Sequence, residues 1–279
     1  MAPELIYRDD VSQVWLGDSK DPEVAGVIMS ERKAQLLCLD APYSARTHEG
    51  HAGGKLTADR AAGYGKSHSP RRAREAAYSR RKAAKGESGR RDIEYQFWSP
   101  SDVETFCDLW VPLTEGWCVS ITDDILAPHW GSSFECNGLL RFAPLPLVET
   151  GSRVRMMGDG PSNWACWIVV ARPRNTKFAR WGALPGAYVQ PGERLINSAG
   201  GSDRIVDSRP DDLVVDPTCG GGTTLVAAKM LGRRCIGVDN NRERAELSAR
   251  MLADTKCQLS VFPESEAEIE QGSLFGEAR

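Results

Sequence analysis

Short apolar runs that end in acidic residues recur in the first part of the chain. They lie at 11–18 (VSQVWLGD) and 35–40 (QLLCLD), and the stretch between them is compatible with a helix. Apolar runs of this length predict buried strands, and a helix between two of them is typical of parallel strands joined by a crossover. The chain therefore opens with the pattern of an α/β protein.

The last third of the chain repeats this alternation more regularly. Strands are predicted at 212–216 and 235–239, each followed by a helix, at 223–231 and 241–252. Two successive strand–turn–helix units favour an α/β fold with a mostly parallel sheet, which we expect to contain about seven strands.

The middle of the chain predicts one more helix and three strands. The helix is expected to begin at Ser99-Pro100 and to end at Gly116, with Val103, Phe106, Cys107 and Trp110 on one face. The strand candidates are the apolar runs 117–122, 138–142 and 164–172. Residues 172–210 are rich in Pro and Gly, which indicates connecting or target-recognition loops.

Charge is distributed unevenly along the chain. Its net charge is −3, yet residues 46–95 hold thirteen Lys and Arg against six Asp and Glu. Residues 44–95 also lack apolar periodicity, so we interpret them as an insertion that contacts a polyanionic partner. The polar, acidic segment 258–279 is expected to be an extended tail.

Composition disfavours several other classes of protein. The eight cysteines include no C-x-x-C pair, so neither a metal site nor a disulfide framework is expected. No apolar run approaches the length of a membrane span, and the N-terminus lacks the pattern of a secretion signal. A cytoplasmic protein is the resulting expectation.

A glycine-rich turn between two predicted strands is the strongest local motif. One strand ends at Asp216, glycines follow at 220–222, and the next strand ends at Asp239. Glycines let a ligand approach the backbone, and an acid about twenty residues later accepts hydrogen bonds from ribose hydroxyls. The alternative is a tight turn with a capping acid, but the full strand–turn–helix–strand register favours nucleoside binding. No G-K-[ST] follows, which disfavours a P-loop.

The predicted strand 35–40 leads into a second motif, Asp40-Ala41-Pro42-Tyr43. Together the two motifs resemble those of S-adenosylmethionine-dependent DNA amino-methyltransferases, with catalytic (D/N/S)-P-P-(Y/F) and cofactor D-P-F-x-G-x-G-T-T signatures. Because the catalytic motif comes first, the chain is similar to the permuted β class, and GDGPSNWACWIVVARP resembles phage-type members. The resemblance implies one Rossmann-like methyltransferase domain over 1–279.

The resemblance also implies a role for individual residues. The Asp40 carboxylate and the Ala41 carbonyl would accept the two protons of an exocyclic amine, Pro42 would fix the turn, and Tyr43 would stack on a flipped base. The cofactor S-adenosyl-L-methionine would be bound by Asp18, Asp216, Thr218, Gly220, Gly222, Thr223 and Asp239.

The sequence departs from the family pattern at two places. Ala41 replaces the usual first proline, which removes rigidity but keeps the carbonyl. The Lys-Pro and apolar helix that complete the methionine pocket in relatives have no clear counterpart in 186–207, so cofactor contacts there stay unassigned.

Double-stranded DNA is the expected partner. The basic segment follows Tyr43 directly, and six of its residues are expected to contact phosphates: Arg71, Arg72, Arg74, Arg80, Arg81 and Lys82. Tyr64, Tyr78 and Tyr95 are candidates for stacking. Gln271-Gly272-Ser273-Leu274-Phe275 resembles a peptide that docks on the replication sliding clamp, and β-class relatives are often homodimers.

The expected reaction is methylation of adenine N6 in a restriction–modification context. N4-cytosine methylation is the nearest alternative, since both amines meet the same acceptors, but family members that modify cytosine usually begin the motif with Ser. RNA or protein glutamine methylation is a further alternative within enzymes. A non-catalytic DNA-binding module is the alternative from another class, which the intact Asp40, Tyr43, Asp216 and Asp239 disfavour.

Overall fold

The structure is a computed structural model that describes residues 2–30, 32–47, 96–150, 165–174, 186–191 and 210–256. Its strands are β1 (Glu4–Arg8), β2 (Ser12–Leu16), β3 (Ala34–Asp40), β4 (Thr114–Thr122), β5 (Leu139–Arg141), β6 (Leu145–Thr150), β7 (Ala165–Pro173), β8 (Tyr188–Pro191), β9 (Leu213–Asp216) and β10 (Arg234–Asp239). Its helices are α1 (Pro22–Met29), α5 (Pro100–Trp110), α6 (Ala127–Cys136), α8 (Thr223–Met230) and α9 (Arg242–Asp254), with a 3-10 turn η1 (Val111–Leu113).

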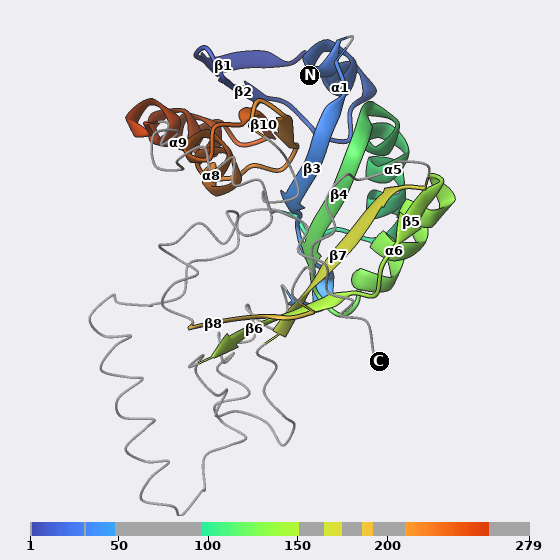
Figure 1. The fold of residues 1–279 in the computed structure, drawn as a ribbon. Helices are drawn as coiled ribbons and strands as arrows, with labels where there is room; N and C mark the ends of the chain where they lie inside the picture. The colour runs from blue at the N-terminus through green and yellow to red at the C-terminus, as the bar shows by residue number, and fades with distance from the viewer. Residues whose placement is uncertain are drawn as a thin grey trace, which may run out of the picture.

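The strands of the described ranges form one sheet, in the order β1-β2-β10-β9-β3-β4-β7-β6-β8, with β5 paired to β7 (Figure 1). Strands β2, β10, β9, β3 and β4 are mutually parallel. Strand β7 is antiparallel to β4, and β6 is antiparallel to β7. Strand β6 therefore points in the same direction as the five parallel strands. The predicted Rossmann-like, mostly parallel sheet is therefore confirmed. The sheet is larger than the expected seven strands because β1, β5 and β8 add to this core.

Side chains of β3 alternate between the two faces of the sheet. Leu37 and Leu39 belong to the core cluster that contains α1, α5 and α6, whereas Leu36 and Cys38 belong to the cluster that contains α8 and α9. This alternation is the period of a strand buried on both faces. Figure 1 shows the result, with α5 and α6 on one side of the sheet and α8 and α9 on the other.

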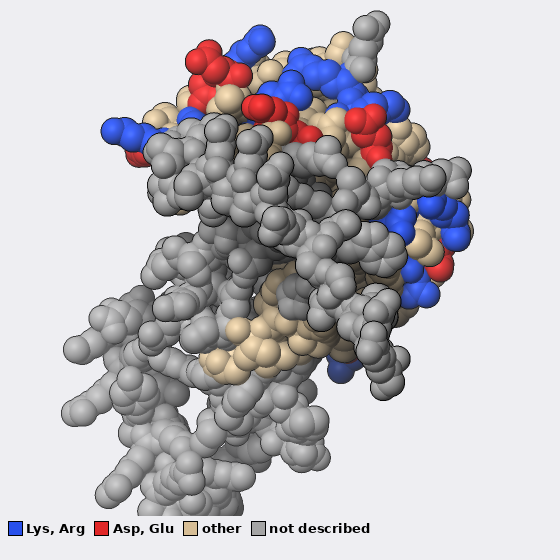
Figure 2. Space-filling view, viewed as in Figure 1, with Lys and Arg blue, Asp and Glu red and all other residues tan. Residues whose placement is uncertain are grey.

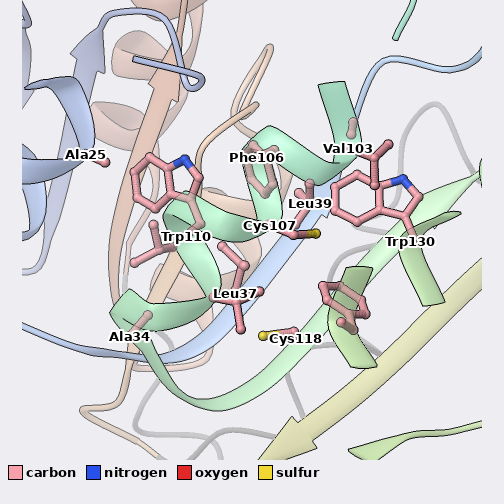
Figure 3. Packing of buried hydrophobic residues seen from close by; sticks show 14 of the residues in the cluster. Ala25, Ala34, Leu37, Leu39, Val103, Phe106, Cys107, Trp110, Cys118 and Trp130 are labelled. Atoms are coloured by element: carbon pink, nitrogen blue, oxygen red, sulfur yellow. The ribbon is translucent and has the colours of Figure 1, made fainter. Parts of the chain in front are cut away.

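Aromatic side chains dominate the core beneath α5 and α6 (Figure 3). Phe106 lies 5.6 Å from Trp130 and 6.1 Å from Trp110, measured between ring centroids. The buried Trp110 indole donates a 2.7 Å hydrogen bond to the Ser19 carbonyl, which attaches α5 to the turn after β2. Burial of each such ring stabilises the fold by about 1.5–3 kcal/mol.

The predicted helix start at Ser99-Pro100 is confirmed by a capping box. The Ser99 side chain accepts from the Asp102 amide, and the Asp102 carboxylate accepts from the Ser99 amide at 2.8 Å. The predicted end of this helix at Gly116 is wrong, because α5 ends at Trp110 and Gly116 lies inside β4. A Cβ at Gly116 would lie 1.8 Å from the Gln35 carbonyl oxygen, so the close approach of β3 explains this glycine.

Two further findings concern the outer parts of the chain. The segment 172–210, predicted as loops, includes the end of β7 and the strand β8, which pairs with β6. Among the helices that the structure describes, none has the length and apolar character needed to cross a membrane.

Candidate active site

Acidic residues at or just after the ends of four parallel strands meet at one edge of the sheet. Strands β3, β9 and β10 end at Asp40, Asp216 and Asp239, and Asp18 follows the end of β2. Carboxyl ends of parallel strands are where α/β proteins bind ligands. A cavity of about 380 Å³ opens at this edge, lined by Asp18, Ser19, Lys20, Asp40, Ala41, Pro42, Tyr43, Gln96, Trp98, Pro217, Thr218, Gly220, Asp239, Asn240 and Arg244.

Most of the catalytic and cofactor residues expected from the sequence line this cavity together. Both the catalytic candidates Asp40–Tyr43 and four cofactor candidates, Asp18, Thr218, Gly220 and Asp239, are among them. The remaining cofactor candidates, Asp216, Gly222 and Thr223, are not among its lining residues. The buried carboxylate of Asp216 accepts a 3.1 Å hydrogen bond from the Thr218 amide, so Asp216 stabilises the turn without lining the cavity.

The glycine-rich turn has the backbone shape that the sequence indicated. Gly220 and Gly222 have φ values of +52° and +86°, a region that other residues rarely adopt. A Cβ at Gly222 would also lie 2.3 Å from the Ser248 hydroxyl, so α9 packs directly on this position. Gly222 is the N-cap of α8 and supplies no side chain to cap the first-turn amides.

Asp239 joins this turn to the neighbouring strand end. One carboxylate oxygen accepts a 3.0 Å hydrogen bond from the Gly220 amide, and the other accepts a 2.8 Å bond from the Asn241 amide. Asp239 is only 7% exposed, and this burial raises its pKa. Each carboxylate oxygen can accept a second bond, so the group has capacity left for donors on a ligand.

The turn Asp40–Tyr43 also lines the cavity. The Tyr43 hydroxyl donates a 3.0 Å hydrogen bond to the Asp40 carboxylate, and the Trp98 amide donates one of 3.0 Å to the Tyr43 carbonyl. Ala41 is buried in the core while Asp40 is exposed. The small side chain at position 41 therefore fits a packed position, and the polar groups of the turn lie on the cavity side.

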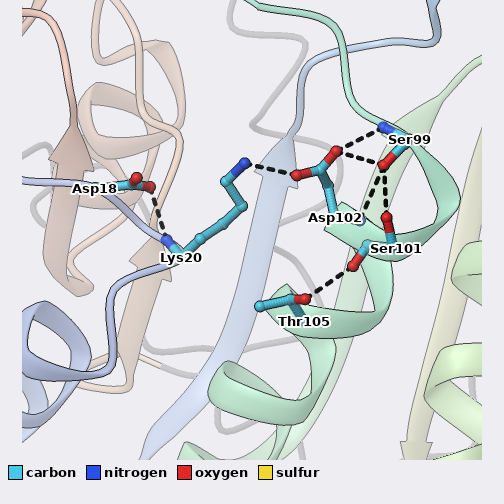
Figure 4. A network of polar contacts seen from close by, with 6 residues as sticks. All are labelled: Asp18, Lys20, Ser99, Ser101, Asp102 and Thr105. Carbon is cyan, nitrogen blue, oxygen red and sulfur yellow. Dashed lines mark hydrogen bonds and ion pairs between the residues drawn. The ribbon is translucent and has the colours of Figure 1, made fainter.

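Lys20 is a pocket residue that the sequence motifs did not indicate. Its ammonium lies 2.6 Å from the Asp102 carboxylate of α5 (Figure 4). It also lies 5.9 Å from the centre of the Trp98 ring. Burial would raise the pKa of Asp102, but hydrogen bonds from Lys20 and Ser99 outweigh it and lower that pKa. This network connects the turn after β2 to the start of α5 across the end of β3 (Figure 4).

Among the residues that the structure describes, the cavity wall carries charges of both signs. Three carboxylates line it, on Asp18, Asp40 and Asp239, against the two cations Lys20 and Arg244. Lys20 is paired with Asp102 of α5, and Arg244 interacts electrostatically with Asp239. Sequence reasoning also did not assign a role to Gln96, Trp98, Asn240 or Arg244. Asn240 directly follows Asp239 at the end of the glycine-rich motif, whereas the other three belong to no short motif.

The residues predicted to contact DNA, Arg71, Arg72, Arg74, Arg80, Arg81 and Lys82, lie outside the described residues, as do Tyr64, Tyr78, Tyr95 and the segment 271–275. On the face shown in Figure 2, the described acidic and basic side chains are interspersed over the upper part of the molecule. The basic insertion and the tail thus stay predictions from the sequence.

Comparisons with known proteins bear on the C-terminal part of this site. The family model described as DNA methylase matches residues 204–250, which include β9, α8, β10 and most of α9. The type II methyltransferase M.EcaI of Enterobacter cloacae is 56% identical over 46 residues, or 16% of this chain and 10% of that protein. The type II methyltransferase M2.LlaDCHI of Lactococcus lactis subsp. cremoris is 38% identical over 48 residues, or 17% and 18%. The chain thus spans less than a fifth of each of these curated relatives.

Solved structures match most of the chain in fold. The M1.HpyAVI–SAM complex superposes with a TM-score of 0.54 at 16% identity, covering 86% of this chain and 98% of that one. TTHA0409 of Thermus thermophilus, a putative DNA modification methylase complexed with S-adenosyl-L-methionine, gives 0.54 at 16% identity, covering 86% and 93%. The cytosine-N4-specific PvuII DNA methyltransferase gives 0.50 at 13% identity, covering 88% and 87%.

In its fold and in its matched segment, the chain is similar to DNA amino-methyltransferases. The resemblance stated from the two motifs is confirmed at this level. Its phage-type character and its restriction–modification context stay predictions.

Proposed function

We propose that this protein transfers a methyl group from S-adenosyl-L-methionine to an exocyclic amine of a base in DNA, with adenine N6 as the target. The observation that carries the proposal is the meeting of two motifs in one cavity. The Asp40–Tyr43 turn and the Gly220–Asp239 element come from distant parts of the chain, yet both line the same 380 Å³ space.

The residues of the cavity suit S-adenosyl-L-methionine. Asp239 has acceptor capacity for ribose hydroxyls, and the turn around Gly220 lets a ligand approach the backbone closely. The carboxylates of Asp18, Asp40 and Asp239 in the described cavity wall suit a ligand that carries a sulfonium. When bound there, the cofactor supplies an activated methyl group. The cavity volume lies within the range of about 300–1,000 Å³ that is usual for small-ligand sites.

Asp40 and Ala41 would prepare the amine for attack. An exocyclic amine conjugated to a base is a weak nucleophile, so acceptors must draw its protons and direct the nitrogen lone pair. The Asp40 carboxylate is exposed and lines the cavity, so it can accept a hydrogen bond from one N–H of the amine. The main-chain carbonyl of Ala41 would accept the other, and Tyr43 would stack on the base after it leaves the duplex.

The choice of adenine rests on the acid at the start of the catalytic motif, Asp40. N4-cytosine methylation is the alternative, and it has support from the fold shared with the cytosine-N4-specific PvuII enzyme. Double-stranded DNA as the substrate rests on the matched DNA methylase segment and on the basic insertion after Tyr43. A homodimer and docking on the sliding clamp stay predictions.

Transfer of labelled methyl groups in vitro tests the proposal. Purified protein is incubated with methyl-labelled S-adenosyl-L-methionine and genomic DNA from a methylation-free bacterial host, and the nucleosides are analysed by mass spectrometry. Label in N6-methyladenine supports the proposal. Label in N4-methylcytosine would show that cytosine N4, the alternative, is the target. The absence of label from DNA, while RNA or protein becomes labelled, refutes DNA as the substrate.

A further inference from the structure

We infer that Asp123, a buried carboxylate at the end of β4, is a positioning residue that holds the Asp40–Tyr43 turn in its working shape. The role of this shape in methyl transfer rests on the proposed function. The contacts that hold the turn do not depend on that function. Asp123 does not line the cavity, and no motif of the sequence singles it out.

The placement of Asp123 follows from the pairing of two parallel strands. In the register of β3 and β4, Asp40 lies beside Ile121. Asp123 stands two residues beyond Ile121, as the chain passes from β4 toward α6. It therefore meets the segment that leaves β3 immediately after the catalytic candidates.

Hydrogen bonds converge on this carboxylate from both sides. One oxygen accepts from the Ser44 amide at 2.9 Å, from the Ser44 hydroxyl, and from the Thr47 hydroxyl at 2.6 Å. The other oxygen accepts from the Leu126 amide at 3.0 Å, at the start of α6. Asp123 thus ties the residues after Tyr43 to a helix that is packed in the aromatic core.

The group is kept charged in its buried position. Asp123 is only 6% exposed, and burial alone would raise its pKa. The hydrogen bonds from Ser44 and Thr47 outweigh that effect and lower the pKa. A buried carboxylate that accepts from four donors is a strong local constraint, since charge-assisted hydrogen bonds are shorter and stronger than neutral ones.

The constraint acts on the catalytic candidates through one peptide. The Ser44 amide belongs to the peptide group whose carbonyl is that of Tyr43, and that carbonyl accepts from the Trp98 amide at 3.0 Å. The Tyr43–Ser44 peptide is therefore held on both sides, by Asp123 and by Trp98. This double attachment fixes where the Tyr43 side chain and the Asp40 carboxylate to which it donates can lie.

Neighbouring Asp124 offers a matched control. Its carboxylate pairs with Arg46 at 3.6 Å, but both side chains are well exposed, at 49% and 74%. Exposed pairs of this kind contribute little. Asp124→Asn removes a charge one residue away without touching the Tyr43–Ser44 peptide.

The test compares Asp123→Asn with Asp124→Asn in two measurements. Asparagine is nearly isosteric, but one oxygen becomes an NH₂ that faces either the Ser44 or the Leu126 amide. We expect the single-turnover rate of methyl transfer to fall about 10- to 100-fold in Asp123→Asn, because small displacements of reacting groups cost that much. We expect the dissociation constant for S-adenosyl-L-methionine to change less than about threefold, since the lost interaction acts on the target side. Asp124→Asn should match the wild type in both.

Hydrogen exchange provides a readout that does not depend on catalysis. The Ser44 amide should exchange slowly in the wild type and faster in Asp123→Asn, as measured by mass spectrometry of a peptide covering 41–47. Should Asp123→Asn fail to fold, Ser44→Ala and Thr47→Val replace it, each removing one hydroxyl donor. A wild-type protein that methylates no DNA would refute the proposed function, while exchange would still decide whether Asp123 holds the turn.

Three results would overturn the inference. Unchanged exchange of 41–47 in folded Asp123→Asn would show that the turn does not depend on the carboxylate. Faster exchange with an unchanged transfer rate would show that the attachment does not serve the reaction. Equal losses of transfer rate and cofactor affinity would indicate general loosening rather than positioning.

Discussion

Replacing Asp239 with alanine should weaken cofactor binding more than any other single change at the glycine-rich turn. The proposed ribose hydrogen bonds end on this carboxylate, and loss of a charged partner costs about 1.5–3 kcal/mol. That range corresponds to an increase of about 10- to 150-fold in the dissociation constant for S-adenosyl-L-methionine. Titration calorimetry measures it directly.

The substitution also has a cost within the protein. Asp239 accepts from the amides of Gly220 and Asn241, and each amide left without a buried partner costs about 1–3 kcal/mol. The thermal midpoint should therefore fall, and calorimetry has to be done well below it. Asp239→Asn retains one acceptor oxygen and should show a smaller loss of affinity.

A distant destabilising variant separates the two effects. Asp9→Asn removes the partner of Lys229, 2.6 Å away and outside the cavity. It should lower the thermal midpoint and leave cofactor affinity intact. An unchanged dissociation constant in folded Asp239→Ala would show that Asp239 is not the ribose ligand. If Asp9→Asn loses cofactor affinity to the same extent, the loss in Asp239→Ala results from lower stability and not from a missing ligand contact.

The site and the charge pattern support three further predictions. Asp40→Ala should abolish methyl transfer while S-adenosyl-L-methionine still binds, and a single-turnover rate within about tenfold of the wild type would contradict the role of Asp40. Neutralising Arg71, Arg72, Arg74, Arg80, Arg81 and Lys82 together should lower the slope of log DNA affinity against log salt by roughly 3, if half of them contact phosphate; an unchanged slope in a folded variant would place the DNA contacts elsewhere. Burial would raise the pKa of Asp9, but hydrogen bonds from Lys229, Tyr7 and two amides lower it to about 2. Because this pKa is lowered, the stability from Asp9 is present above its usual value of 3.8 and is lost as the pH falls toward 2. The difference in thermal midpoint between wild type and Asp9→Asn should therefore shrink over that window, and a constant difference would contradict the assignment.

The elements that carry the site were predictable because their signals are local. Strand β3 is a continuous apolar run that ends in Asp40. The glycines after β9 indicate a tight turn, because glycine readily adopts the positive φ values that such a turn requires. The start of α5 followed from Ser99, whose side chain accepts from the Asp102 amide, and from Pro100, which has no amide hydrogen to satisfy in the first helical turn. Residue type and spacing were sufficient at these places.

Other elements depend on contacts that the sequence does not express. Strand β1 has an exposed, mixed pattern and is defined by its pairing with β2. Helix α6 carries Pro128, Gly131 and two serines, a composition that does not indicate a helix, and is stabilised through Trp130 and Phe134 in the core. Gly116 was interpreted as a helix end because its true cause, the backbone of β3, is distant in sequence.

The same reasoning applies to the pocket residues that were missed. Lys20 reaches the cavity from the turn after β2 and Arg244 from the start of α9, and each is one of many cations in the sequence. Trp98 follows the insertion in sequence, and its amide donates a hydrogen bond to the carbonyl of Tyr43, which precedes the insertion. This contact brings Trp98 to the pocket. Sequence motifs identify residues that are neighbours along the chain, whereas these become neighbours only when the sheet forms.

Methyl transfer to an exocyclic amine in DNA, directed by Asp40 and its turn, can be tested inside a cell. DNA is isolated from a methylation-free bacterial host that expresses either the wild type or Asp40→Ala, and its nucleosides are analysed by mass spectrometry. We expect N6-methyladenine in DNA from the wild-type strain and none in DNA from the Asp40→Ala strain, with both proteins present at equal levels. Equal amounts of methylated base from both strains, or 5-methylcytosine from the wild type alone, would contradict the proposed function.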